Sequence, residues 1–197
     1  AEYQAAIAAM KQDTLTMGPK TQEFQNKFAQ KHGTKYAYAC SNCTTGMHVI
    51  TQLFDIKPGD EVIVTPNTFV ATSLVILKEG GIPVFADIDP RTFNLDPEDV
   101  ERKITKKTKA IYVVHYAGLM VDMDPIMELA AKHNLFVIED ACQAIGAEYK
   151  GRRVGSIGNY GAFSFFPSKN LGCFGDGGAV SCDTAERGKL LRIFRNH

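Results

Sequence analysis

Four short runs in the middle of the chain consist almost entirely of apolar and β-branched residues. Turn residues bound each run, and the runs span residues 61–66 (EVIVTP), 82–88 (IPVFADI), 110–118 (AIYVVHYAG) and 135–141 (LFVIEDA). Strands that are apolar at successive positions, rather than at every second one, are usually buried on both faces. The pattern therefore predicts a parallel sheet that is covered by helices on both sides.

Helical periodicity fills the intervals between these runs, at residues 68–79, 96–103 and 124–133. Alternating strands and helices of this length form right-handed crossovers between parallel strands. The expected fold class is therefore α/β, with a mostly parallel central sheet flanked by helices.

The flanking segments extend the same pattern. Residues 21–33 (TQEFQNKFAQKHG) predict an amphipathic helix that ends at Gly33, and residues 34–40 predict a short strand before a helix at 46–54. Residues 161–166 (GAFSFF) and 177–182 (GGAVSC) predict two more short strands on either side of a glycine-rich turn. No linker or internal repeat interrupts the chain, so we expect one continuous domain.

Composition excludes several classes of function. Of the 197 residues, 45% are hydrophobic and 22% are charged, which is the balance of a folded globular protein. The 22 Lys and Arg residues balance the 22 Asp and Glu residues, whereas a general nucleic-acid binder needs a basic excess. No apolar run approaches the roughly 20 residues that cross a bilayer. Residues 1–13 (AEYQAAIAAMKQD) predict an amphipathic helix, without the basic and then apolar plan of a signal peptide.

Cysteine usage bears on location. The five cysteines are odd in number and irregularly spaced, which favours reduced thiols in a cytoplasmic protein over a disulfide framework.

The carboxyl ends of parallel strands are where an α/β sheet is expected to carry its chemistry. Asp140 ends the run LFVIED, where its carboxylate could meet a cationic group of a ligand, and strand alternation turns Glu139 to the opposite face. Asp140 could equally cap a following helix. Both interpretations stay open on these residues alone.

A single cation lies among aromatic residues, proline and glycine in FSFFPSKNLGCFGDGG. This is Lys169, and apolar surroundings favour the uncharged amine that forms a Schiff base. Ser164, five positions earlier, could bind an anion, although a purely structural hydroxyl is the simpler interpretation.

The segment SNCTTG (41–46) is a small-residue turn that leads into a helix. Backbone N–H groups at a helix start bind phosphate without basic side chains. Cys40 and Cys43 have a CxxC spacing, which suggests redox chemistry or half of a zinc site. No second CxxC or suitably spaced histidine pair follows, so no metal site is expected, and both interpretations rank below phosphate binding.

Together these segments resemble the DegT/DnrJ/StrS-type sugar aminotransferases, pyridoxal-phosphate (PLP) enzymes of the aspartate-aminotransferase fold (fold type I). The resemblance runs through nearly the whole chain. It is carried by MGPKTQEF (17–24), SNCTTGMH (41–48), PGDEVIVTPNTFVAT (58–72), GIPVFADIDPRTFNLD (81–96), HYAGLMVDMD (115–124), VIEDACQAIGAEYKGRRVGSIG (137–158), FSFFPSKNLGCFGDGGAV (163–180) and the final RNH.

The resemblance implies a role for each matching residue. Lys169 corresponds to the lysine that holds PLP covalently. Asp140 corresponds to the carboxylate that pairs with the pyridine nitrogen, which keeps the ring protonated so that the cofactor can act as an electron sink. Gln143 corresponds to a position near the ring where some relatives carry histidine, and Phe69 to the aromatic residue that stacks on it.

The same resemblance assigns the cofactor's phosphate to Ser164 and to the backbone amides of Cys43 and Thr44. Cys43 departs from the family, which commonly has glycine there, but only an N–H group is needed at this position. The segment HYAG (115–118) also departs from a frequent family pattern, so substrate-facing contacts are expected to differ from those of typical members.

By resemblance, the expected reaction is transfer of an amino group from an amino acid, Glu or Gln, to a keto sugar. The acceptor would be a nucleotide-linked sugar in amino-sugar biosynthesis, with pyridoxamine phosphate (PMP) formed between the two half-reactions. Alternatives are a cyclic ketone acceptor such as a keto-inositol, a sugar dehydratase, a PLP-binding module without turnover, and a redox protein that uses Cys40 and Cys43. Lys169 argues against the dehydratase, because histidine replaces the lysine in those relatives.

The resemblance also implies a homodimer whose subunits share their active sites, with no membrane or nucleic-acid partner. Neither end of the chain looks like a natural terminus. We therefore expect residues 1–197 to be the PLP-binding large domain of a longer enzyme, truncated at both ends and without its small C-terminal domain.

Overall fold

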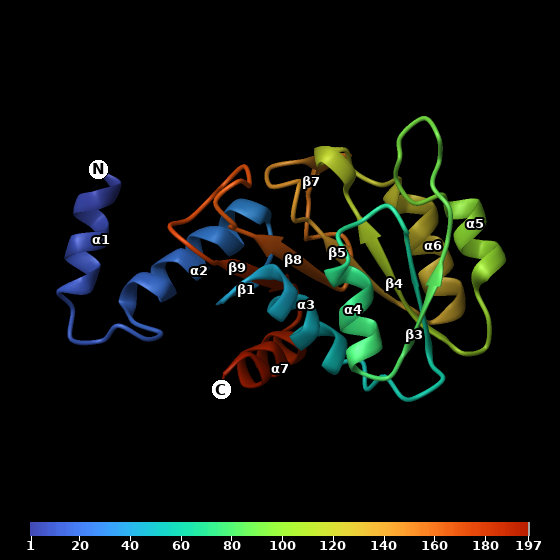
Figure 1. The fold of residues 1–197 in the computed structure, drawn as a ribbon, viewed down its shortest axis with the longest axis horizontal. Helices are drawn as coiled ribbons and strands as arrows, with labels where there is room; N and C mark the ends of the chain where they lie inside the picture. Colours follow the sequence, from blue (N-terminus) through green and yellow to red (C-terminus); the bar gives the residue numbers. More distant parts are fainter. Residues whose placement is uncertain (197) are drawn as a thin grey trace.

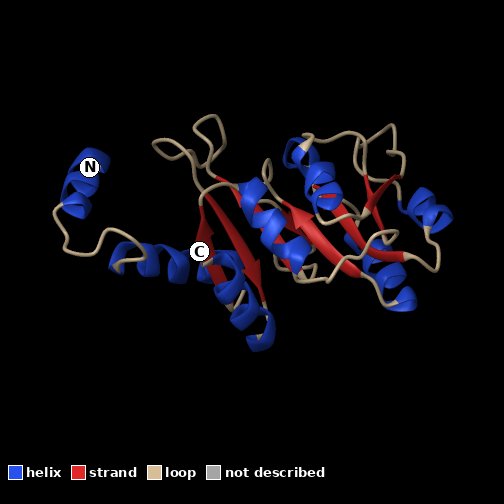
Figure 2. Ribbon diagram, turned by 60° about the horizontal axis from the view of Figure 1, so that its bottom comes forward, coloured by secondary structure: helices blue, strands red, loops and turns tan. Residues whose placement is uncertain are grey.

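The computed structural model describes residues 1–196 and has three layers, with helices on both faces of a seven-stranded sheet (Figure 1, Figure 2). The strand order is β1-β9-β8-β5-β4-β2-β3. The strands are β1 (Tyr36–Cys40), β2 (Glu61–Val64), β3 (Ile82–Phe85), β4 (Thr108–Val114), β5 (Phe136–Asp140), β8 (Tyr160–Ser164) and β9 (Gly178–Cys182).

Five neighbouring strands, from β3 through β2, β4 and β5 to β8, are parallel. Strand β9 is antiparallel to β8, and β1 is antiparallel to β9. The predicted α/β class with a mostly parallel sheet is confirmed. Because the five parallel strands point the same way, the loops after β2, β4, β5 and β8 lie at one edge of the sheet.

Each face of the sheet has its own helices. The helices are α1 (Glu2–Met10), α2 (Pro19–His32), α3 (Cys43–Gln52), α4 (Ala71–Lys78), α5 (Pro97–Lys103), α6 (Met123–His133) and α7 (Ala185–Arg195), with a 3-10 turn η1 (Tyr116–Gly118). Helices α3, α4 and α7 pack into one apolar cluster, α5 and α6 into a second, and α2 into a third.

Strand alternation explains why the central runs are apolar throughout. In β4, Tyr112 lies in the cluster with α3 and α4, whereas Ile111 and Val113 lie in the cluster with α5 and α6. In β5, Ile138 and Val137 are divided in the same way, and all five side chains are fully buried. Burial on both faces is the property that the sequence pattern predicted.

Two predicted helices differ at their starts. The helix expected at 46–54 begins at Cys43, because Asn42 caps it: the Asn42 side chain accepts a hydrogen bond from Thr45 N, and the Thr45 hydroxyl accepts one from Asn42 N. The helix expected at 68–79 begins at Ala71.

Two further segments depart from the sequence pattern. The amphipathic helix expected at the start of the chain exists as α1, but none of its residues is buried, and α1 lies apart from the sheet (Figure 1, Figure 2). A separate hairpin of β6 (Glu148–Tyr149) and β7 (Arg152–Arg153) was not predicted.

None of the helices within residues 1–196 is both long enough and apolar enough to cross a lipid bilayer.

Candidate active site

A cavity of about 430 Å³ opens at the carboxyl edge of the sheet. Its wall comes from the start of α3, the start of α4, the end of β5 and the loop that joins β8 to β9. All seven residues that were singled out as site residues line it, namely Cys43, Thr44, Phe69, Asp140, Gln143, Ser164 and Lys169. The fold thus brings together residues from four separate segments of the chain.

Asp140 is the last residue of β5 and is buried, with an exposed fraction of 4%. One carboxylate oxygen accepts a hydrogen bond from the Thr72 hydroxyl at 2.9 Å, and the other accepts one from Cys142 N at 3.1 Å. No helix follows Asp140, so the helix-cap interpretation is wrong. The two contacts instead orient the carboxylate toward the cavity and leave it able to accept further hydrogen bonds.

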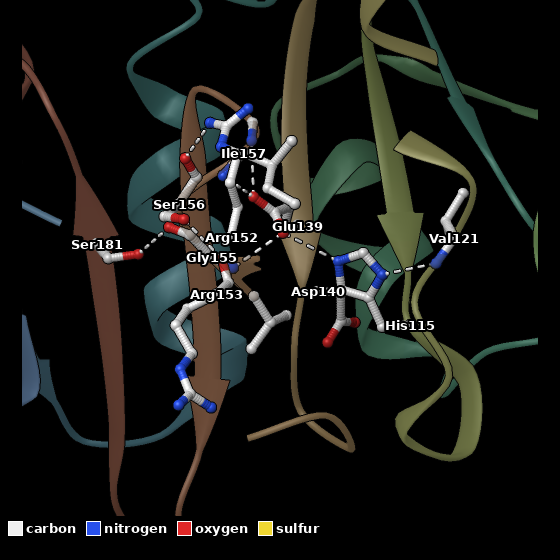
Figure 3. Close-up of polar contacts among 12 residues, drawn as sticks. His115, Val121, Glu139, Asp140, Arg152, Arg153, Gly155, Ser156, Ile157 and Ser181 are labelled. Atoms are coloured by element: carbon white, nitrogen blue, oxygen red, sulfur yellow. Dashed lines mark hydrogen bonds and ion pairs between the residues drawn. The ribbon is translucent and has the colours of Figure 1, made fainter. Parts of the chain in front are cut away.

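Glu139 lies on the opposite face of β5 and is fully buried (Figure 3). Its carboxylate accepts hydrogen bonds from the backbone N–H groups of Gly155 (2.8 Å), Ile157 (2.7 Å) and Gly158 (2.6 Å). Burial opposes ionisation of Glu139, but a hydrogen bond from His115 and those from the backbone outweigh it, so its pKa lies below the usual value.

His115 follows β4 and is fully buried. Its Nδ1 accepts a hydrogen bond from Val121 N at 3.1 Å, so Nε2 carries a proton and donates to Glu139 at 3.0 Å (Figure 3). These contacts join the ends of β4 and β5 to the segment 155–158. A one-residue shift of β5 would break all of them, so they fix Asp140 on the face of β5 that lines the cavity.

The start of α3 offers unpaired backbone donors. The amides of Cys43 and Thr44 cannot bond within the helix, and no other group in the described part of the chain accepts from them. The N-terminal end of a helix also carries partial positive charge. This end of the cavity can therefore bind an anion without a basic side chain.

Ser164 ends β8 beside that helix start and is mostly buried. In the sheet it pairs with Gly178 of β9, and a Cβ at Gly178 would lie only 2.5 Å from the carbonyl carbon of Asn42 and 2.7 Å from Cys43 N. Glycine at 178 is therefore what allows the start of α3 to pack against the start of β9. That contact brings the α3 amides and the Ser164 hydroxyl to one side of the cavity.

Lys169 lies in the loop between β8 and β9 and is half-buried. Hydrogen bonds from Phe165 N to Gly177 O and from Cys173 N to Phe165 O, both 2.8 Å, close the base of this loop. Lys169 N also donates to Phe166 O at 2.8 Å, which forms a turn at the lysine. The loop is thus an ordered support for the amine, although 13 residues separate β8 from β9.

Gln143 and Phe69 complete the set. The Gln143 side-chain oxygen accepts a hydrogen bond from Ala117 N at 2.7 Å, which leaves its amide nitrogen available to donate. The Phe69 ring is 75% exposed at the cavity wall, an unusual exposure for a large apolar side chain.

The CxxC spacing does not form a reactive pair. Burial raises the pKa of Cys40 to about 12, and the neighbouring Cys142 thiol together with burial holds the pKa of Cys43 well above its usual value. Both thiols are therefore protonated at neutral pH, whereas redox-active cysteines need a thiolate. The high pKa values of Cys40 and Cys43 therefore disfavour the redox hypothesis. The thiol in the same cluster as Cys43 and Asp140 is that of Cys142, not that of Cys40.

Sequence reasoning missed several residues that line the cavity, including Asn42, Thr72, Cys142, Ser168 and Asp176. Thr72 carried a usable signal, because it lies three positions after Phe69 at the start of a predicted helix, and such positions share a helix face. Cys142 also carried a usable signal, because it lies only two residues after Asp140, in the loop at the carboxyl end of β5. Of the RNH segment, His197 lies outside the described residues.

Known proteins resemble the chain closely in sequence and structure. The chain is 42% identical over 181 residues to the UDP-2-acetamido-2-deoxy-3-oxo-D-glucuronate aminotransferase of Pseudomonas aeruginosa, covering 92% of this chain and 50% of the relative. The structure of S. venezuelae DesV, solved with a ketimine intermediate, matches with a TM-score of 0.95 and 41% identity over 99% of this chain and 53% of DesV.

NtdA of Bacillus subtilis, solved with the bound cofactor PMP, matches with a TM-score of 0.83 and 37% identity over 89% of this chain and 40% of NtdA. The chain spans about half the length of the curated relatives it matches. The family model for DegT/DnrJ/EryC1/StrS aminotransferases matches residues 1–197. The chain belongs to the DegT/DnrJ/EryC1/StrS aminotransferase family.

Proposed function

We propose that this chain binds PLP and that the complete protein transfers an amino group from an amino acid to a nucleotide-linked keto sugar. One observation carries the proposal: the Lys169 amine, the Asp140 carboxylate and the unpaired amides of α3 all line one cavity. An amine, a buried carboxylate and an anion site are the three features that an aldehyde, a pyridine nitrogen and a phosphate require.

The residues present fit the cofactor. A cavity of about 430 Å³ lies within the range of roughly 300–1,000 Å³ typical of small-molecule sites. The amides of Cys43 and Thr44 and the Ser164 hydroxyl would hold the phosphate, and Phe69 offers an exposed aromatic face for the ring. Gln143 would donate a hydrogen bond to the cofactor from its side-chain amide nitrogen, because its side-chain oxygen already accepts one from Ala117 N.

When bound, PLP supplies an electron sink for charge that develops on the carbon of an attached amine. Asp140 would hold the proton on the ring nitrogen, supported by the hydrogen bond from Thr72. Lys169 would hold the cofactor through Nζ and, once displaced by the amino donor, would move a proton from the donor's α-carbon through the same Nζ.

The family relationship supports a sugar acceptor. The Pseudomonas relative is named for a UDP-linked 3-oxo sugar, and NtdA was solved with PMP, the aminated form of the cofactor. We extend the nucleotide-linked keto sugar and the PMP form of the cofactor to this protein as a proposal, with Glu or Gln as the amino donor.

We also propose that the protein acts as a homodimer in the cytoplasm and that this chain is the cofactor-binding large domain of a longer enzyme. Large apolar side chains are exposed on the cavity wall (Phe69 and Phe166) and on the loop that joins β8 to β9 (Leu171 and Phe174), where a second subunit would cover them. All five cysteines are unpaired, which suits a reducing compartment.

Half-reactions of the complete protein test the proposal. With bound PLP, glutamate or glutamine should convert the cofactor to PMP and release one equivalent of the matching keto acid. A nucleotide-linked keto sugar should then restore the PLP spectrum, whereas a keto-inositol should not. If no amino donor converted PLP to PMP, the protein would be a PLP-binding module without turnover. If only the keto-inositol restored the PLP spectrum, the acceptor would be a cyclic ketone and not a nucleotide-linked sugar.

A further inference from the structure

Three potential metal ligands meet in the wall of the cavity. The Sγ atoms of Cys43 and Cys142 and a carboxylate oxygen of Asp140 all lie within 4.8 Å of one another. Cys43 begins α3, and Cys142 follows β5 two residues after Asp140. The proposed transamination uses neither thiol, because Cys43 contributes only its backbone amide.

These two thiols differ from the other three in the chain. The thiols of Cys40, Cys173 and Cys182 each donate to a backbone carbonyl oxygen close by in sequence, those of Asn42, Gly175 and Thr184. The thiols of Cys43 and Cys142 instead lie beside each other and beside a carboxylate. Each Asp140 oxygen accepts one hydrogen bond, so each retains a free lone pair.

We propose that Cys43, Asp140 and Cys142 form a binding site for a thiophilic divalent cation such as Zn²⁺, and that this cation and PLP exclude each other. A tetrahedral Zn²⁺ ion with Zn–S bonds of about 2.3 Å holds its sulfur ligands about 3.8 Å apart. The ligand atoms of the cluster already lie within 4.8 Å of one another, which is close to the spacing that such an ion requires. Two sulfur donors select against Mg²⁺ and Ca²⁺, which prefer oxygen.

Binding has a defined proton balance. Each thiol loses its proton to solvent as its sulfur forms a bond to the cation, so one bound ion releases up to two protons. Asp140 contributes a carboxylate oxygen, and a water molecule would complete the tetrahedral coordination. The sequence indicated no metal site because Cys142 is far from Cys43 along the chain and does not form part of a CxxC motif with it.

Exclusion follows from the shared carboxylate. An ion held by Asp140 would neutralise the carboxylate that is proposed to pair with the ring nitrogen of PLP. This part of the inference rests on the proposed function, whereas binding of the cation itself does not. The cation would then hold the cofactor-free protein in an inactive form.

Cobalt titration of the complete, cofactor-free, reduced protein tests the site. Co²⁺ replaces Zn²⁺ in such sites and gives an intense thiolate charge-transfer absorption. We expect one Co²⁺ per chain with this absorption, and its loss when Zn²⁺ is added. Replacing a residue that only hydrogen-bonds to a metal ligand weakens metal binding roughly 10–100-fold. Cys142→Ser and Cys43→Ala each remove a direct ligand, so each should weaken Co²⁺ binding at least about tenfold.

Cys182→Ala is the matched control, because Cys182 is also buried but does not line the cavity. Circular dichroism would establish that each variant is folded.

Zn²⁺-loaded protein should take up PLP only after a chelator is added, as monitored by PLP fluorescence. Absence of the thiolate absorption in the unmodified protein, its retention at full affinity in Cys142→Ser, or equal loss in Cys182→Ala would overturn the site. Uptake of PLP at the same rate with and without Zn²⁺ would overturn the mutual exclusion of Zn²⁺ and PLP. None of these outcomes bears on transamination by the metal-free enzyme, so they are distinguishable from failure of the proposed function.

Discussion

The Thr72 hydroxyl donates a hydrogen bond of 2.9 Å to the Asp140 carboxylate, although 68 residues separate the two in sequence. Both side chains are buried, so the contact is made away from bulk water. A hydrogen bond to a charged group contributes about 1.5–3 kcal/mol. Thr72→Val keeps the shape of the side chain and removes the donor. We expect it to weaken PLP binding about tenfold or more, as measured by equilibrium titration of the complete protein.

Ser73→Ala provides the control for this change. Ser73 is the next residue of α4, and its side chain does not line the cavity. Its removal should leave PLP affinity unchanged. If both variants bind PLP as the unmodified protein does, Thr72 does not support Asp140.

Replacement of Glu139 should destabilise the fold without touching the cavity. Glu139→Gln places an amide group against backbone N–H donors that now face a carboxylate. Removing one partner of a buried charged network costs roughly 3–5 kcal/mol. Chemical denaturation should show a loss of this order. Glu128→Gln, an exposed change on α6, should show almost none, and equal stabilities of the two variants would contradict the assigned role.

The same carboxylate should contribute a pH-dependent part of the stability. Its folded-state pKa lies below the usual value of 4.5, so the folded protein binds the proton less readily than the unfolded chain. The stabilisation is complete above that usual value and is lost as pH falls through the folded-state pKa. The difference in unfolding free energy between the unmodified protein and Glu139→Gln should therefore shrink below about pH 4.5. A difference that grew on acidification would have the wrong sign.

Gly178 should be intolerant of any side chain. The added methyl group of Gly178→Ala would meet backbone atoms of Asn42 and Cys43, which cannot move without shifting the start of α3. Overpacking of this kind costs roughly 1–3 kcal/mol. We expect lower thermal stability and weaker PLP binding, measured by melting and by titration.

Gly177→Ala separates this effect from a general loss of glycine. Its methyl group would chiefly meet the end of the Cys173 side chain, which can rotate away. Wild-type behaviour of Gly177→Ala beside a weakened Gly178→Ala would support the close approach, and equal losses in both would contradict it.

Much of the fold was predictable because its central strands are buried on both faces. The runs around Ile111 and Val137 are apolar at successive positions, and strand alternation alone placed Asp140 and Glu139 on opposite faces. The prediction failed for the hairpin of β6 and β7. Its turn residues, Lys150 and Gly151, both have positive φ, but lysine is not a residue that signals such a turn.

The candidate site was predictable where a residue type dictates its chemistry and hidden where a contact depends on packing. The apolar surroundings of Lys169 singled it out and the resemblance gave it a role, and the small residues before α3 indicated an anion site. The pairing of Thr72 with Asp140 and the meeting of Cys43 with Cys142 depend on how α3 and α4 pack against the sheet. No local pattern encodes such distances.

The central claim is that Lys169 holds PLP covalently in this cavity. Borohydride reduction of the PLP-loaded complete protein, followed by peptide mass spectrometry, tests it most directly. The account predicts that the reduced cofactor is attached to Lys169, and that Lys169→Arg loses the label while Lys106→Arg, an exposed control, retains it. Attachment to another lysine, or full labelling of Lys169→Arg, would contradict the account.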